Sequence, residues 1–278
     1  MRTAAITIAA GRHAHLRRQR EGLAHGVRRP DHHLVVAMGD PRIAEIHPRP
    51  DVLDLDVTGP LPLARARNLG ARRALDLGAE LLIFLDVDCI PGPTLVERYR
   101  QVADRALLCG TVAYLPPSPP GGYKLKNLDA LARPHPSRPA PAAGEIDRHG
   151  DHRLFWSLSF AVTAPTWRAI GGFDDRYTGY GGEDTDFGQR ARANGVPLWW
   201  VGGAPAYHQH HAVSTPPVEH LDDILRNAER FHRRWGWWPM RGWLEAFEAQ
   251  GLVHYDHHRG RWARTSRPPR ARASASRR

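Results

Sequence analysis

The sequence has 278 residues, of which 41% are hydrophobic and 24% charged, a balance that is ordinary for globular proteins and excludes collagen, a coiled coil and a wholly disordered chain. No apolar run approaches the ~20 residues of a membrane-spanning helix, and charge follows the short apolar N-terminal stretch at once, which argues against a signal peptide. The formal net charge of +10 suggests a nucleic-acid partner, but eight arginines and no acid fall in residues 259–278, and removing them leaves only +2.

The first third of the chain alternates between short apolar runs and segments with helical spacing. The short runs end at glycine or polar residues and predict buried strands, whereas the longer segments repeat their apolar residues every three to four positions. Strands are expected at 3–10, 33–38, 51–57 and 81–85, and helices at 13–24 and 63–77. Because strands and helices alternate with short connections, we predict an α/β fold with a mostly parallel sheet flanked by helices.

The middle of the chain, from Tyr114 to Asp151, is rich in proline, glycine and serine. Helices and central strands are not expected there, and so long a loop is usually a lid, a binding loop or a disordered segment. Regular structure is expected to resume as strands at 154–163 and 198–201 and as helices at 165–170, 183–193, 220–234 and 243–250. We therefore predict one domain over residues 1–250, made of a first half (1–110), a loop region (111–152) and a second half (153–250).

The Arg-rich tail, residues 259–278, lacks the apolar residues needed to fold, and we predict that it is disordered and dispensable for catalysis. A weak contact of this tail with RNA or anionic lipid is the alternative. The chain has two cysteines, Cys89 and Cys109, which favour reduced thiols and a cytoplasmic protein. Peripheral attachment at the inner face of the membrane is the alternative location.

Asp86 and Asp88 follow the most clearly predicted strand, Leu81–Leu85. Side chains alternate along a strand, so both carboxylates can project to one side while Val87 turns inward. In open α/β sheets ligands bind beyond the carboxyl ends of the strands, and two carboxylates there suit Mn²⁺ or Mg²⁺, which binds diphosphate oxygens. We predict a metal–diphosphate site, with a solvated turn as the structural alternative.

A second acidic cluster follows a segment rich in glycine and aromatic residues, 171–182. Glycine permits close backbone approach and suits a loop wrapped round a ligand. Glu183 and Asp184 then fall in the first turn of a predicted helix, with Asp186 close behind. Acids in a first turn also complement the helix dipole, and that structural explanation suffices for Asp186. It does not account for the segment before Glu183 and Asp184, which we predict to be functional.

Three histidines follow the predicted strand at 198–201, namely His208, His210 and His211. One histidine can complete an oxygen-rich metal site and shift its preference from Mg²⁺ toward Mn²⁺. The alternative is a histidine-only zinc site made of all three, which would leave the aspartate pair unexplained. Most of the other histidines are expected to lie on the surface.

Together these stretches resemble the GT-A glycosyltransferases, in particular the inverting β-1,4-galactosyltransferase group and the related family 2 enzymes. The match extends over roughly residues 3–235 and keeps the order and approximate spacing of the motifs. The matching stretches are 64–70, 84–91, 171–174 and 179–186, followed by His208. The resemblance implies a GT-A fold with a nucleotide-binding sheet and an acceptor-binding C-terminal half.

The resemblance also implies functions for individual residues. Asp86 and Asp88 would bind the metal and the donor diphosphate, with His208, or else His211, as the third metal ligand. Glu183 would hold the acceptor, and Asp184 would be the catalytic base. The nucleotide pocket would include Gly11, Arg12, Asn68 and Asp40, with Asp56 as the alternative to Asp40 for contacting uracil.

The implied reaction transfers a hexosyl group from a nucleotide-diphosphate sugar, with UDP the expected nucleotide, to a hydroxyl of a glycan or small molecule. Mn²⁺, or Mg²⁺, would neutralise the charge that develops on the leaving nucleotide. One carboxylate suffices as base for a single displacement, so inversion is expected. Six aromatic residues are candidates for stacking on sugar rings or, alternatively, for core packing: Trp156, Phe160, Tyr177, Tyr180, Trp199 and Trp200.

Two other functions would explain parts of the sequence. A nucleic-acid binder that uses the Arg-rich tail would bind in a salt-sensitive way and would leave both acidic clusters without a function. A nucleotidyltransferase also needs carboxylates and a metal on an α/β sheet, but it does not need the segment that leads into Glu183 and Asp184.

Overall fold

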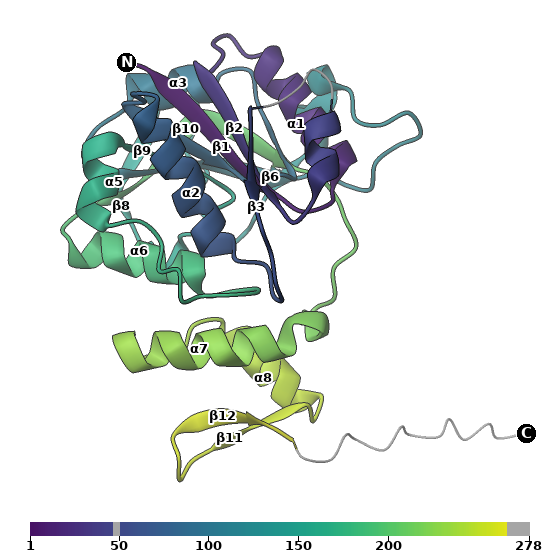
Figure 1. The fold of residues 1–278 in the computed structure, drawn as a ribbon, viewed down its shortest axis with the longest axis vertical. Coiled ribbons are helices and arrows are strands. Elements are labelled where there is room, and N and C mark those ends of the chain that lie inside the picture. Colours follow the sequence, from purple (N-terminus) through teal and green to yellow (C-terminus); the bar gives the residue numbers. More distant parts are fainter. Residues whose placement is uncertain (47–50, 266–278) are drawn as a thin grey trace, which may run out of the picture. The chain divides into compact units, whose positions relative to one another are not determined.

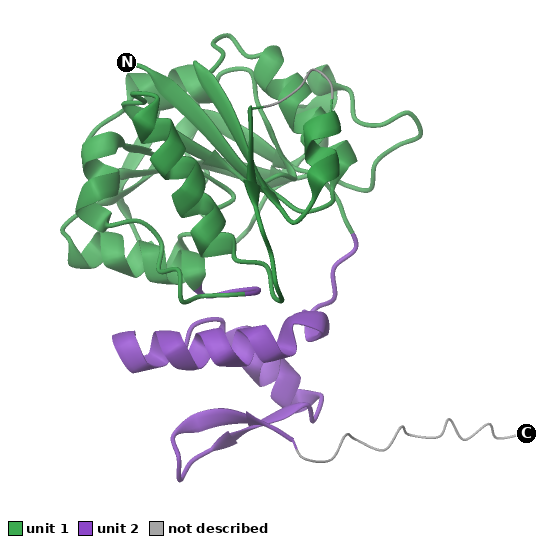
Figure 2. Ribbon diagram, viewed as in Figure 1, with its two compact units in different colours: residues 1–178, 183–211 green, residues 179–182, 212–278 purple. Residues whose placement is uncertain are grey.

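The described chain divides into two compact units, and a ten-stranded sheet forms the centre of the first (Figures 1 and 2). The computed structural model describes residues 1–46 and 51–265. Unit 1 comprises residues 1–178 and 183–211, and unit 2 comprises residues 179–182 and the chain from Ala212 onward. This division differs from the single domain 1–250 expected from the sequence.

The central sheet is mixed, and most of its long strands are parallel. Its order is β3-β2-β1-β4-β9-β6-β10-β5, in which β9 and β5 run antiparallel to their neighbours; β7 also pairs with β6, and β8 with β10. The carboxyl ends of β1, β2, β4, β6 and β10 therefore lie along the same side of the sheet, which we call its carboxyl edge. The strands are β1 (Thr3–Ala9), β2 (His32–Met38), β3 (Asp51–Leu55), β4 (Leu81–Leu85), β5 (Cys89–Pro91), β6 (Leu107–Tyr114), β7 (Arg133–Pro134), β8 (Ile146–Gly150), β9 (Ser159–Thr163) and β10 (Leu198–His208).

Helices cover both faces of this sheet, as strand β4 illustrates. Ile83 packs in one cluster with Leu23 of α1 and Tyr99 of α3, whereas Phe84 faces the other way and stacks on Trp167 of α5 at 5.2 Å. Such alternation is the reason a fully apolar strand is stable when both faces are buried. The helices of unit 1 are α1 (His13–Ala24), α2 (Leu63–Asp76), α3 (Leu95–Gln101), α4 (Leu128–Leu131), α5 (Ala164–Ile170) and α6 (Glu183–Ala193), with short 3₁₀ turns η1 (Pro41–Glu45), η2 (Leu125–Asn127) and η3 (His152–Leu154).

Unit 2 has its own small core, formed by Ile224, Leu244, Phe247 and Val253, against which the half-buried Trp262 packs. Its elements are η4 (Val218–His220), α7 (Leu221–Trp235), α8 (Arg241–Ala249), β11 (Val253–Asp256) and β12 (Arg261–Arg264).

The four-residue segment 179–182 belongs to unit 2 because α7 holds its backbone. Asn227 donates to the carbonyl of Gly181 at 2.8 Å, and the N–H of Tyr180 donates to Asp223 at 3.2 Å. A side chain at Gly179 would lie 2.0 Å from the Asp223 carboxylate, so only glycine fits there. None of the helices described in either unit is long and apolar enough to cross a bilayer.

The α/β fold class and most of the predicted elements are confirmed, and α1, β4 and α6 have the predicted bounds. Strand β9 begins at Ser159 rather than at 154, and β10 continues beyond 201 to His208. The loop region 111–152 is not wholly irregular, since it holds α4, β7 and β8. Strand β6 was not predicted. Within it, Gly110 allows a close approach of β10, since a side chain there would lie 2.2 Å from the Ala204 carbonyl oxygen.

The predicted start of the disordered tail at residue 259 is wrong, because residues 261–264 form strand β12 and pair with β11. The rest of the predicted tail, residues 266–278, lies outside the described residues. The physical reason for the error is Trp262, a large apolar side chain within the arginine run that joins the core of unit 2.

We expect truncation after His258 to lower the free energy of unfolding of unit 2 by about 1–3 kcal/mol, because it removes β12 and the burial of Trp262. Truncation after Thr265 keeps both and is the matched control, with an unchanged melting temperature expected. Thermal unfolding followed by tryptophan fluorescence measures the difference. Equal melting temperatures for the two truncated chains would contradict a structural contribution of β12.

Candidate active site

The loop after β1 places Gly11 and Arg12 at the carboxyl edge of the sheet. Both have left-handed backbone angles, with φ of 62° at Gly11 and 52° at Arg12, and a non-glycine residue in that region is strained. The N–H of Gly11 donates to Asp40 at 2.7 Å, and His13 lies 2.7 Å from the same carboxylate. Burial opposes ionisation of Asp40, but these hydrogen bonds outweigh it and lower its pKa. An ionised carboxylate therefore lies beside Gly11.

Asp86 and Asp88 lie in a tight turn between β4 and β5, not on a continuing strand as expected. The N–H of Cys89 donates to the carbonyl of Asp86 at 2.8 Å and closes this turn. Buried Gln19 donates to the same carbonyl at 2.7 Å, and the N–H of Gln209 donates to the carbonyl of Asp88 at 2.7 Å. The turn is thereby fixed to α1 and to the end of β10, and its two carboxylates take different partners.

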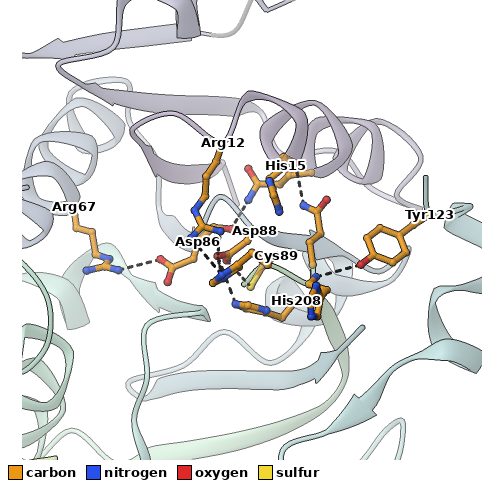
Figure 3. Close-up of polar contacts among 12 residues, drawn as sticks. Arg12, His15, Arg67, Asp86, Asp88, Cys89, Tyr123 and His208 are labelled. Atoms are coloured by element: carbon orange, nitrogen blue, oxygen red, sulfur yellow. Dashed lines mark hydrogen bonds and ion pairs between the residues drawn. The ribbon is translucent and has the colours of Figure 1, made fainter. Parts of the chain in front are cut away.

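Asp88, His208 and His211 form a group able to hold a metal ion, which we call the metal-competent group, since one ligand atom from each lies within 4.8 Å of the others. Figure 3 labels Asp88 and His208 of this group. The Asp88 carboxylate is 3.5 Å from Nε2 of His208 and 3.3 Å from Nε2 of His211. Arg12 lies 3.6 Å from the same oxygen. The sequence left open which of these two histidines is the ligand, and the structure brings both to Asp88. Asp86 does not belong to this group.

The protonation states of the group suit metal coordination. Burial opposes ionisation of Asp88, but His211, His208 and Arg12 outweigh it and lower the pKa of this carboxyl. Burial also lowers the pKa of His208, which favours a neutral imidazole with a free lone pair. One carboxylate and two imidazoles suit Mn²⁺ better than Mg²⁺, which prefers oxygen ligands.

Arg67, on α2, connects the two acidic clusters. It is only 4% exposed, and its two terminal nitrogens bond Asp86 and Glu183 at 3.0 Å each (Figure 3 shows the bond to Asp86). Burial opposes its charge, but the carboxylates of Asp86 and Glu183 outweigh this and raise its pKa, so the guanidinium stays charged. The forked shape of arginine allows one side chain to bridge two carboxylates.

Glu183 and Asp184 form the N-terminal end of α6, and burial raises the pKa of both. The pKa of Glu183 rises to about 7. One oxygen of Glu183 bonds Arg67, whereas its Oε2 is buried and has no hydrogen-bond partner among the described residues. Asp184 is half-buried and accepts hydrogen bonds from the N–H of Thr185 at 2.6 Å and from the N–H of Ser157. A reachable carboxylate beside an unsatisfied one suits the binding and deprotonation of a hydroxyl.

Other predicted site residues lie apart from these groups. Asn68 bonds both the N–H and the carbonyl of Phe173 at 2.9 Å, so its amide fixes the loop before α6. His210 is exposed and is not part of the metal-competent group, which speaks against a zinc site of three histidines. Asp56 is exposed, whereas Asp40 bonds the Gly11 loop. Among the aromatic candidates, Phe160, Tyr177 and Trp200 are buried, whereas Trp156 and Trp199 are half-buried and Tyr180 is 38% exposed.

Sequence reasoning missed two residues that build the site. Arg67 lies inside the stretch 64–70 and shares the buried face of α2 with Ala64, Ala71 and Ala74, so its helical spacing is a signal that could have found it. Gln19 receives a hydrogen bond from the hydroxyl of Thr7 at 2.8 Å and donates to the Asp86 carbonyl, yet a lone glutamine in an Arg-rich helix gives no signal. Both act through contacts between segments distant in sequence.

We expect Arg67→Met to lower the free energy of unfolding by about 3–5 kcal/mol at pH 8, because Asp86 and Glu183 lose their buried counter-charge. Without the guanidinium their folded-state pKa values rise further above the unfolded values, so the loss is largest when both are ionised and shrinks as the pH falls toward 5. Urea unfolding at the two pH values measures this. Arg65→Met, on the exposed face of α2, is the matched control, and equal losses in both variants would contradict the bridge.

Comparison with known proteins supports the resemblance seen in the sequence. Residues 142–212 match a family model described as the N-terminal domain of galactosyltransferase. Validoxylamine A glucosyltransferase of Streptomyces hygroscopicus subsp. jinggangensis is 28% identical over 208 residues, which cover 62% of this chain and 44% of the relative. Chondroitin synthase of Escherichia coli is 30% identical over 177 residues, covering 53% of this chain and 25% of the relative. The chain thus spans less than half the length of these relatives.

Solved structures confirm the fold. The structure of GalNAc-T7 with UDP, GalNAc and Mn²⁺ aligns with a TM-score of 0.59 at 15% identity, covering 84% of this chain and 48% of that one. The structure of S. aureus TarS 1–349 aligns with a TM-score of 0.54 at 12% identity, covering 82% of this chain and 65% of that one. The fold is therefore that of the GT-A glycosyltransferases, as the sequence motifs implied.

Proposed function

We propose that this chain, which has the GT-A fold and relatives named as glycosyltransferases, is an inverting metal-dependent glycosyltransferase. It moves a hexosyl group from a nucleotide-diphosphate sugar, with UDP as the nucleotide, to a hydroxyl of a glycan or small molecule. The observation that carries the proposal is that two groups of functional residues lie at the carboxyl edge of the sheet. Asp88, His208 and His211 form the first group, and Glu183 and Asp184 form the second. Asp86, which lies in the same turn as Asp88, bonds Arg67, and Arg67 also bonds Glu183.

The chain's own residues divide the work of the reaction. Asp88, His208 and His211 would hold Mn²⁺, which when bound supplies a Lewis acid for the leaving diphosphate. Asp40, held ionised beside Gly11, would accept a hydrogen bond from the N–H of a uracil ring. Arg12, beside the Asp88 carboxylate, is exposed enough to reach phosphate oxygens.

Glu183 and Asp184 would bind and activate the sugar acceptor. The unsatisfied oxygen of Glu183 is an acceptor for a sugar hydroxyl and so orients the incoming group. Asp184 takes the proton of the attacking hydroxyl as the new glycosidic bond forms and the bond to the diphosphate breaks on the opposite face. A single displacement of this kind inverts the anomeric configuration and needs no covalent intermediate.

Hydrolysis and transfer assays with UDP-, GDP- and dTDP-sugars, with Mn²⁺, with Mg²⁺ and after chelation, test the proposal. Release of the nucleoside diphosphate, fastest with a UDP-sugar and Mn²⁺, is expected, and NMR of the product fixes its anomeric configuration. Release of inorganic diphosphate instead would favour a nucleotidyltransferase. No turnover, with salt-sensitive RNA binding that is lost on truncation after Thr265, would favour a nucleic-acid binder.

A further inference from the structure

A row of aromatic rings leads from the metal-competent group to a buried arginine in the loop region 111–152. The distances between ring centroids are 4.8 Å from His208 to Tyr114, 5.8 Å from Tyr114 to His135 and 4.9 Å from His135 to Trp156. The guanidinium of Arg138 then lies over the ring of Trp156 at 5.2 Å. The residues of the row are each half-buried, so part of each side chain stays accessible.

Arg138 itself is 92% buried, since its relative exposure is 8%. Its guanidinium lies over Trp200 at 4.9 Å as well as over Trp156, but it has no ion pair and no side-chain hydrogen bond among the described residues. Its Nε and Nη2 atoms are both enclosed without an acceptor. A cation–π contact stabilises the charge but supplies no oxygen for these N–H groups. Burying a charge with unsatisfied donors is costly, and such a group calls for an explanation.

A carboxylate is the group that would satisfy Arg138. Arginine presents paired in-plane N–H donors that match the two oxygens of a carboxylate. The half-buried Trp156 offers flat apolar surface of the kind on which sugar rings stack, whereas the buried Trp200 supports the guanidinium from beneath. The row also passes the reaction centre, because Ser157, next to Trp156, donates its N–H to Asp184.

We propose that Arg138, with Trp156 and Trp200, forms a subsite for the carboxylate of an acidic sugar, a hexuronate. This inference rests on the proposed function, which it narrows from sugars in general to those with a negative charge. The acidic sugar is either the donor residue or the acceptor, since the row of rings begins at the metal-competent group and ends beside the proposed base.

Arg148 supplies the matched control. It lies in the same loop region, and its guanidinium lies over the ring of Trp199 at 4.8 Å, a contact of the same kind as that of Arg138. Arg148 is exposed, however, so its charge is solvated and needs no partner. Both variants lose a positive charge and a cation–π contact, but only Arg138→Met removes a buried charge with unsatisfied donors. A difference in ligand preference between the two variants therefore reports on that buried charge.

The experiment compares acidic and neutral probes by calorimetry. The donor arm uses UDP-glucuronate and UDP-glucose with Mn²⁺, and the acceptor arm uses methyl β-glucuronide and methyl β-glucoside, with and without UDP and Mn²⁺. The wild type is expected to prefer the acidic probe in one arm by about 10- to 100-fold, the usual worth of a charge-assisted hydrogen bond. Arg138→Met should abolish that preference, leave UDP affinity unchanged and leave the melting temperature equal or higher. Arg148→Met should keep the preference.

Several outcomes would overturn the subsite. One is that the wild type binds acidic and neutral probes with equal affinity in both arms. Another is that Arg138→Met keeps the preference for the acidic probe. If Arg138→Met does not fold, Arg138→Lys replaces it, since lysine keeps the charge but lacks the paired donors; full preference in that variant also overturns the proposal. Failure of UDP to bind the wild type would instead overturn the proposed function, and the difference between acidic and neutral probes in the two arms would still decide on the subsite.

Discussion

Asp88→Asn is expected to weaken Mn²⁺ binding, and with it Mn²⁺-dependent binding of a UDP-sugar, by at least about 100-fold. Asp88 supplies the only carboxylate of the group that also contains His208 and His211. An amide oxygen is a weaker ligand without charge, and it would leave the two imidazoles and Arg12 without their anionic partner. Titration with Mn²⁺ followed by electron paramagnetic resonance measures the loss directly, without dependence on turnover.

The histidines next to Asp88 allow a sharp control. His208→Ala and His211→Ala are each expected to weaken Mn²⁺ binding, whereas His210→Ala, between them in sequence but exposed, should not. Asp104→Asn, at an exposed position in the loop between α3 and β6, controls for the loss of a negative charge. Unchanged Mn²⁺ affinity in Asp88→Asn, or full activity of the wild type after chelation, would contradict the metal site.

Asp184→Asn is expected to reduce the transfer rate by about 10²- to 10⁴-fold while donor affinity stays near that of the wild type. Asparagine keeps the size and polarity of the side chain, and its oxygen still accepts from the N–H of Thr185, so the start of α6 is preserved. It has no basic oxygen to take a proton from the attacking hydroxyl. Single-turnover transfer, alongside calorimetry with the donor, separates the two effects.

The same base predicts how the transfer rate changes with pH. Burial raises the pKa of Asp184, and the neighbouring Glu183 has a pKa of about 7, so the pair binds protons at a higher pH than exposed carboxyls do. The ionised base is therefore depleted as the pH falls through the neutral range. The wild-type rate should rise between pH 5.5 and 8, and the small residual rate of Asp184→Asn should lack this dependence.

Glu183→Gln should differ from Asp184→Asn by raising the acceptor KM more than it lowers kcat, because we propose that Glu183 holds the acceptor rather than moves its proton. Full transfer by Asp184→Asn would show that this residue is a structural cap of α6. A loss of donor binding as severe as in Asp88→Asn would place Asp184 in the donor site instead.

The sequence predicted the parts of the site whose signal is local. Asp86 and Asp88 follow an unmistakable buried strand, and Glu183 and Asp184 begin a helix after a run of glycines, so their placement at the sheet edge could be inferred from their neighbours. The turn geometry at Asp86 could not be inferred in this way, because it depends on Gln19 and Gln209, which come from the opposite ends of unit 1.

Long-range contacts explain the other errors. Arg67 lies on the apolar face of α2, so its burial follows from the helical spacing, but the two carboxylates that it bonds could not be predicted from that spacing. Trp262 reads as one apolar residue in a disordered tail until β11 pairs with its strand. In each case the deciding partner lies far away in sequence, and local periodicity carries no information about it.

The two edges of the central sheet also bear on how the protein behaves at high concentration. Open edge strands expose unpaired backbone groups that can pair with another copy and start aggregation. Strand β3, at one edge, carries the exposed charges of Asp51 and Asp54, and β8, along the other, carries Asp147 and Arg148. Strand β5 completes that second edge with only three residues, and Pro91 among them has no N–H to offer. Charge, shortness and proline thus keep neighbouring molecules from extending the sheet, so a concentrated solution should stay free of β-sheet aggregates.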